Sequence, residues 1–197
     1  MMDFGCLLLL LSSASALRGE AAPRVALNDG SSMASINLGG FIHPERTYGA
    51  VRSALSAGYH LVDTAQAYEN EAEVGAALRD HLAASGAERS AFAISTKLSA
   101  ECHGFEAAQA AVRASRDRLG VGYIDRVLIH TPYGGKLVET YDALLALQRD
   151  GVVRAVGVSN FGEDHLDALE VRPIDNVPFQ DCLPLNKKGN RRVRSGG

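Results

Sequence analysis

The chain has 197 residues, of which 46% are hydrophobic and 22% charged, with a formal net charge of −3. This composition is typical of one globular domain and argues against disorder over most of the length. Five basic side chains lie in residues 186–197, so the rest of the chain is acidic, which argues against nucleic acid as the main partner. We expect residues 186–197 to form a solvated, disordered basic tail; a binding arm is the alternative.

The amino terminus is similar to a signal peptide. A short apolar run covers residues 6–11, and Ala14 and Ala16 form a small-residue cleavage pattern. The run is too short to span a bilayer as a helix. We therefore expect residues 1–16 to be removed and the mature chain to enter the secretory pathway or an organelle reached through it. No basic residue precedes the run, so an ordinary apolar terminus of a cytoplasmic protein is the alternative.

Short β runs alternate with helical segments from residue 35 onward, after a hairpin predicted over residues 25–36 with its turn at Asp29–Gly30. Helical spacing of apolar residues predicts five helices, the first starting at Pro44 and the last covering about residues 163–170. The third and fourth helices are expected to end at Gly120 and Gly151. The predicted strands cover residues 35–41, 59–63, 91–97, 126–130, 152–159 and 177–180.

Each of the first four helices has an apolar face that we expect to be buried. Strand–helix alternation predicts that these faces cover a parallel sheet with right-handed crossovers. The residues expected in the core are Val51, Ala54 and Leu55; Val74, Ala77 and Leu78 with His81 or Leu82; Phe105, Ala108, Val112 and Leu119; and Tyr141, Leu144 and Leu145.

Two α/β architectures fit this alternation, an open doubly wound sheet and a closed (β/α)8 TIM-type barrel. The first strand carries no GxGxxG fingerprint, only Gly39 and Gly40, and polar residues end nearly every strand. Both observations favour the barrel, whose active site is spread over several strand ends. About six strands and five helices are predicted, which is roughly two βα units short of eight.

Three predicted strands end in ionisable residues, Asp63, Lys97 and His130, and Tyr68 follows five residues after the first. The carboxyl ends of parallel strands meet at one rim, so we expect the four side chains to converge on one pocket. Each has a structural alternative: Asp63 as a helix cap or ion-pair residue, Tyr68 as a rim aromatic, and His130 as a core histidine. Cys102 and Cys182 show no metal-ligand spacing, and we expect no metal site.

The segments VDTAQAYENEAEVGAAL, STK, LIHTP and GVSNF resemble, in this order, the aldo-keto reductase family. The resemblance implies that residues 24–185 form an NADP-dependent oxidoreductase domain that uses NADPH to reduce an aldehyde or ketone. Tyr68 would give a proton to the carbonyl oxygen, and Lys97 would stabilise the resulting phenolate. Asp63 would hold Lys97 in place and charged, and His130 would orient the substrate oxygen by a hydrogen bond.

The same resemblance implies a cofactor site. A serine and an asparagine after the fifth strand and a glutamine on the sixth would hold the nicotinamide carboxamide, while the two glycines of the first strand would let the cofactor approach closely. Capping of the following helix is the alternative role for the serine and the asparagine. The cofactor-binding residues implied are Gly39, Gly40, Asp63, Ser159, Asn160 and Gln180.

The resemblance decays after Gln180, where the sequence reads DCLPLNKK. In the family, the units that follow supply the groups that hold the adenosine phosphates. We therefore expect the 197-residue chain to bind NADPH poorly, with little preference over NADH. The alternative function is non-catalytic: a truncated barrel that acts as a regulatory or interaction module, or an incomplete gene product.

Overall fold

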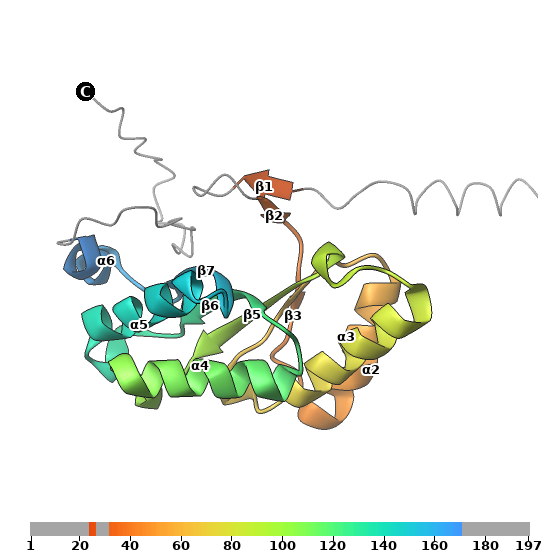
Figure 1. Cartoon of the computed structure of the whole chain (residues 1–197), viewed down its shortest axis with the longest axis horizontal. Helices are drawn as coiled ribbons and strands as arrows, with labels where there is room; N and C mark the ends of the chain where they lie inside the picture. Colours follow the sequence, from red (N-terminus) through yellow and green to blue (C-terminus); the bar gives the residue numbers. More distant parts are fainter. Residues whose placement is uncertain (1–23, 27–31, 171–197) are drawn as a thin grey trace, which may run out of the picture.

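The computed structural model describes residues 24–26 and 32–170, and within them five parallel strands alternate with helices (Figure 1). The strands of this sheet are β3 (Leu38–Gly39), β4 (Leu61–Asp63), β5 (Ala93–Leu98), β6 (Ile124–Ile129) and β7 (Val153–Val158). The helices are α2 (Pro44–Ser56), α3 (Glu71–Ser85), α4 (Phe105–Leu119), α5 (Leu137–Arg149) and α6 (Glu163–Glu170). Short 3-10 turns are η1 (Gln66–Tyr68), η2 (Arg89–Ala91), η3 (Ala100–Cys102) and η4 (Pro132–Gly134).

The order of the strands decides between the two architectures. Each strand pairs in parallel with the next one along the chain, in the order β3-β4-β5-β6-β7. A doubly wound sheet reverses its strand order at a switch point, and no such reversal occurs among the described strands. The sheet is therefore part of a (β/α)8 TIM-type barrel, as the strand-end pattern predicted. The sixth predicted strand, residues 177–180, lies outside the described residues.

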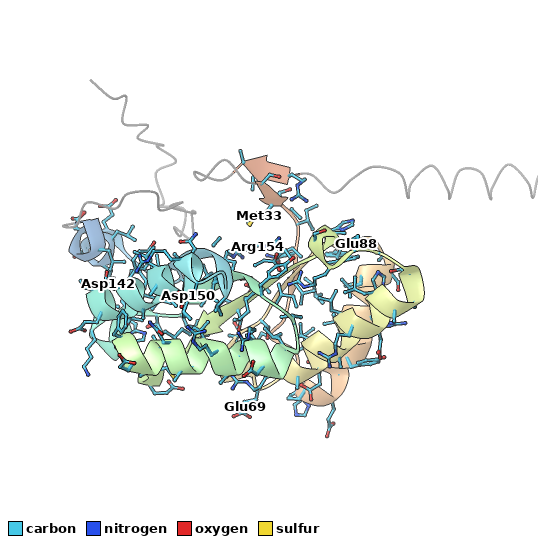
Figure 2. All side chains as sticks on the ribbon, in the orientation of Figure 1. Met33, Glu69, Glu88, Asp142, Asp150 and Arg154 are labelled. Atoms are coloured by element: carbon cyan, nitrogen blue, oxygen red, sulfur yellow. The ribbon has the colours of Figure 1, made fainter. Side chains whose placement is uncertain are left out.

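The predicted amino-terminal hairpin is confirmed. β1 (Arg24–Ala26) pairs antiparallel with β2 (Ser32–Ala34), and its predicted turn lies outside the described residues. Figure 1 shows the hairpin on the side of the sheet away from helices α3 and α4. In Figure 2, Met33 points from β2 toward the strands, and Arg126 of β6 donates to its sulfur at 3.3 Å. Glu69, which follows η1, lies on the opposite side of the molecule (Figure 2).

Most of the predicted core is buried. The expected apolar faces of α2 and α3 pack inward, and the α4 and α5 faces do so apart from two residues. Phe105 is 40% exposed because it is the first residue of α4, where the helix begins at the rim. Leu145 is half-buried, as are His81 and Leu82, since they lie at the margins of their helix faces.

The first strand is much shorter than predicted. Residues 35–41 were expected to be extended, but only Leu38 and Gly39 pair with β4. The chain then turns, because the Ile42 amide donates to the Gly40 carbonyl at 2.7 Å. A Cβ atom at Gly40 would lie 2.2 Å from the Asp63 carbonyl oxygen, so only glycine allows this close approach of β3 to β4.

No helix within residues 24–26 and 32–170 is both long and apolar enough to cross a bilayer.

Candidate active site

The carboxyl ends of β4, β5 and β6 bring the predicted site residues together. Asp63 is the last residue of β4, Lys97 lies in β5, and His130 directly follows β6. Asp63 pairs in register with Ser95, two residues before Lys97. Side chains two residues apart on a strand share a face, so Lys97 lies on the face of Asp63, one layer closer to the rim. The predicted convergence of these strand ends is therefore observed.

Asp63 and Lys97 form an ion pair through Oδ2 and Nζ. Lys97 Nζ also donates to the Thr64 carbonyl oxygen at 3.0 Å. The Lys97 side chain is only 9% exposed, so these hydrogen bonds must compensate its ammonium for the hydration that it loses on burial. The pair thus holds a positive charge at a defined point just below the rim.

Tyr68 lies directly over this charge. Lys97 Nζ is 5.1 Å from the centre of the Tyr68 ring, and the His130 ring meets the Tyr68 ring edge-on at a centroid distance of 5.8 Å. Phe41, which is 85% exposed, contacts the Tyr68 ring edge-on at 5.1 Å. The four residues singled out in the sequence therefore form one cluster, with a phenol between an ammonium and an imidazole.

The surroundings of His130 favour its neutral form. Partial burial lowers the pKa of His130, and the Lys97 ammonium lowers it further, while the Asp63 and Glu101 carboxylates act weakly in the opposite direction. Near neutral pH the imidazole therefore carries one N–H. A neutral imidazole can donate that hydrogen to an oxygen without adding a second cation beside Lys97.

Ser159 and Asn160 follow β7 at the same rim. Asn160 has a left-handed backbone (φ 61°), and its Nδ2 donates to the His130 carbonyl at 2.8 Å and to Ser159 Oγ at 3.1 Å. The two bonds do not cap a helix, which was the alternative prediction, since α6 begins only at Glu163. They leave the Ser159 hydroxyl hydrogen to donate and the Asn160 Oδ1 to accept, which is the complement of a carboxamide. Both residues therefore fit the predicted nicotinamide contact.

The other cofactor-binding predictions have different outcomes. The close approach of β3 to Asp63 requires a glycine at position 40, independently of any contact with a cofactor. At Gly39 a Cβ atom would meet nothing within 4 Å, so that position is open. The cofactor roles of both glycines and of Asp63 stay predictions. Gln180 lies outside the described residues.

Two polar residues beneath the site, the buried Ser95 and the mostly buried Arg126, were missed from the sequence. Arg126 pairs in register with Ser95 and donates to its Oγ at 3.0 Å, and it lies 3.8 Å from Asp63 Oδ1. The Asp63 carboxylate is thus shared between two cations, Lys97 and Arg126. The signal was available, because Arg126 lies four residues before His130 and alternation places both on one face of β6.

The described part of the chain holds no cluster of three or more histidine, cysteine or acidic residues arranged for a metal. Cys102 is a free thiol there, and burial raises its pKa. The neighbouring His103 is buried, and its Nδ1 lies 2.8 Å from the Gly135 carbonyl oxygen.

Comparison with known proteins assigns the family. Residues 30–183 match the model of the Aldo/keto reductase family. The chain belongs to this family. An aldo-keto reductase of Mycolicibacterium smegmatis is 42% identical over 194 residues, which is 92% of this chain and 65% of that protein. An aldo-keto reductase of Mycobacterium sp. strain KMS is 48% identical over 171 residues, or 83% of this chain and 60% of that one.

Solved aldo-keto reductases share the fold. The enzyme of Brucella melitensis is 34% identical with a TM-score of 0.73, covering 80% of this chain and 59% of its own. The Bombyx mori aldo-keto reductase in complex with NADP is 28% identical with a TM-score of 0.75, covering 81% and 57%. This aldo-keto reductase chain therefore spans between about half and two thirds of the length of the relatives it matches.

Proposed function

We propose that this protein is an NADPH-dependent oxidoreductase that reduces a small aldehyde or ketone to the alcohol. The observation that carries the proposal is the position of Tyr68, whose ring lies 5.1 Å from Lys97 Nζ and edge-on to His130. Family membership supports oxidoreductase chemistry in general, and the relative solved with NADP supports the choice of cofactor.

Each residue of the cluster has a role that its surroundings support. Carbonyl reduction builds negative charge on the substrate oxygen, which needs a proton. Tyr68 is the proton donor, because the neighbouring ammonium of Lys97 stabilises the phenolate that remains. Asp63 holds that ammonium charged, as their ion pair indicates. His130, neutral near pH 7, donates a hydrogen bond that orients the oxygen.

The nicotinamide would be held at the end of β7. The Ser159 hydroxyl would donate to the carboxamide oxygen, and Asn160 Oδ1 would accept from the carboxamide nitrogen. Asn160 is already fixed by its bonds to the His130 carbonyl and to Ser159. When bound, the reduced nicotinamide supplies the hydride for the carbonyl carbon.

The test is Tyr68→Phe, with Tyr133→Phe as a matched control because Tyr133 is 82% exposed. Loss of a positioned acid lowers turnover by about 10²–10⁴-fold, so Tyr68→Phe should remove most reduction of an aromatic aldehyde, followed as NADPH oxidation. The control should keep wild-type turnover. Wild-type rates in Tyr68→Phe would refute the assignment. A wild-type chain without turnover that still binds NADPH would favour the non-catalytic alternative.

The cofactor preference has its own experiment. Fluorescence titration of the full chain with NADPH and with NADH would compare the two affinities directly. Ser159→Ala should weaken both equally, because the carboxamide is common to both cofactors. A clear preference for NADPH would support the proposed cofactor and contradict the weak preference expected from the sequence, whereas equal affinity for the two cofactors would match that expectation and argue against an NADPH-specific enzyme.

We further propose that residues 1–16 are removed on the way into the secretory pathway. The apolar run of residues 6–11 and the pair Ala14 and Ala16 support this proposal. Amino-terminal sequencing of the protein from its native host should begin at Leu17. A sequence that begins at Met1 or Met2 would contradict it and favour a cytoplasmic protein.

A further inference from the structure

Asn70 is a fully buried polar residue, two positions after Tyr68, that the proposed reaction does not use. It stands at the N-cap of α3, where an asparagine normally bonds its side chain to the first helical amides. Here the side chain makes no such bond. The residue has 0% of its surface exposed, so its amide must be satisfied by other partners.

Those partners are the hydroxyl of Thr47 in α2, 3.1 Å from Asn70 Nδ2, and two further segments, one at Thr64 and one at residues 40–42. Thr64 Oγ1 donates to Asn70 Oδ1 at 2.6 Å. Asn70 Nδ2 donates to the carbonyl oxygens of Gly40 and Ile42 at 2.8 and 3.0 Å. One buried amide thus joins the end of β3 to the residue that follows Asp63.

Both segments carry parts of the site. The carbonyl oxygen of Thr64 accepts the hydrogen bond from Lys97 Nζ at 3.0 Å. The Gly40–Ile42 segment carries Phe41, whose ring meets Tyr68 edge-on at 5.1 Å. A shift of either segment would therefore move a neighbour of the Tyr68 ring.

The backbone between Tyr68 and Asn70 transmits this anchoring. Glu69 adopts a left-handed conformation, with φ 53°, which a glutamate does not favour on its own. Such a conformation persists only where the surroundings hold it. On the other side of the turn, Gln66 accepts a hydrogen bond from the Ser99 amide at 2.9 Å and donates to Ser115 Oγ at 2.9 Å. Tyr68 is therefore held between two hydrogen-bonded amide side chains, the half-buried Gln66 and the buried Asn70.

We propose that Asn70 is a positioning residue for Tyr68: it locks the Phe41 segment and Thr64 so that the phenol stays over Lys97. The consequence for catalysis rests on the proposed function, whereas the consequence for the position of Tyr68 does not.

The experiment labels the full chain with 3-fluorotyrosine and records its fluorine NMR spectrum. The chain has six tyrosines, and the Tyr68 signal is the one lost in Tyr68→Phe. Asn70→Ala should shift or broaden the Tyr68 signal and leave that of buried Tyr141 unchanged. Thr64→Val, a milder change, should have the same effect on the Tyr68 signal. Thr64→Ser keeps the donor hydroxyl and should therefore give the wild-type signal.

Thr140→Val is the matched control. Thr140 is also fully buried, and its hydroxyl accepts from the Gly104 amide and donates to the Lys136 carbonyl, both at 2.8 Å, away from Tyr68. It should lower the melting temperature without moving the Tyr68 signal. An unchanged Tyr68 signal in Asn70→Ala, or in Thr64→Val if Asn70→Ala does not fold, would overturn the proposal.

Kinetics then separate positioning from binding. If the wild-type chain reduces a carbonyl, Asn70→Ala should lower kcat by about 10²-fold with little change in KM, since small misplacements of a reacting group have effects of that size. A chain without turnover would refute the proposed function, and the NMR result would still decide the role of Asn70.

Discussion

The two ends of the described sheet, β3–β4 and β5–β7, are stabilised by different kinds of contact. β3 and β4 have two and three residues and share two register pairs. β5, β6 and β7 have six residues each, and β6 and β7 share five pairs. The short end compensates with side-chain hydrogen bonds from Asn70 and Thr47 to the loop after β3. The long end instead relies on its hydrogen-bond ladder and on buried aliphatic residues.

This difference matters because the site draws on both ends. Asp63 and Tyr68 come from the short end, whereas Lys97 and His130 come from the long end. Polar networks are directional and fix geometry, while apolar packing supplies most of the stability. We therefore expect changes at the long end to affect mainly the free energy of unfolding. Changes at the short end should affect mainly the position of the site.

The largest loss of stability is expected from Leu144→Ala in α5. Leu144 has 0% of its surface exposed, so the substitution leaves a cavity and should cost about 2–5 kcal/mol of unfolding free energy. Urea denaturation would measure it. Leu145→Ala is the matched control, because Leu145 is half-buried and should lose much less. Equal losses for the two leucines would contradict the placement of the α5 core face.

Gly40→Ala should have the next largest effect, at the short end. The new Cβ atom would lie 2.2 Å from the Asp63 carbonyl oxygen, which cannot move without displacing β4, so we expect a cost of about 1–3 kcal/mol. Gly39→Ala is the control, since no atom lies within 4 Å there. Thermal unfolding of both variants tests the close approach. A neutral Gly40→Ala would show that β3 is not held against Asp63.

Thr47→Val should cost less than either, about 0.5–1.5 kcal/mol, because it removes hydrogen bonds but keeps the shape. The Thr47 hydroxyl lies 3.1 Å from the His43 carbonyl and 3.1 Å from Asn70 Nδ2. If the polar contacts of the short end position the site, kcat of Thr47→Val should fall although this small loss of unfolding free energy leaves the chain folded. A Thr47→Val variant as unstable as Leu144→Ala would contradict the expectation that the short end contributes less to the free energy of unfolding than the long end.

The smallest effect concerns pH. Burial lowers the pKa of His130 and of His81 in the folded chain, so below a pH of about 6.5 the unfolded state binds more protons than the folded state. Stability should therefore be lost as the pH falls from about 7 through the lowered pKa values. Urea denaturation across this range should give a shallower loss for His130→Gln than for wild type. An identical pH dependence would show that His130 titrates normally.

Much of the site could be predicted from local pattern. Asp63 ends β4, Lys97 is the next-to-last residue of β5 and His130 directly follows β6, and in a parallel sheet that placement alone brings them to one rim. Apolar periodicity likewise located the helices, and most of their predicted faces are buried. The prediction was wrong for Phe105, because periodicity does not reveal which turn of a helix projects beyond the sheet.

The sequence by itself determined the alternation of strands and helices, the type of sheet and the ionisable residues at the strand ends. These depend on spacing along the chain, which the sequence contains. Only the tertiary structure decided that Arg126 shares the Asp63 carboxylate and that Asn70 bonds to the β3 loop instead of capping α3. Each of those bonds joins residues that are 28 to 63 positions apart, as the Asn70–Ile42 and Arg126–Asp63 contacts illustrate. Such contacts are chosen by burial, since a polar group removed from water must take whichever partner the packing brings within reach.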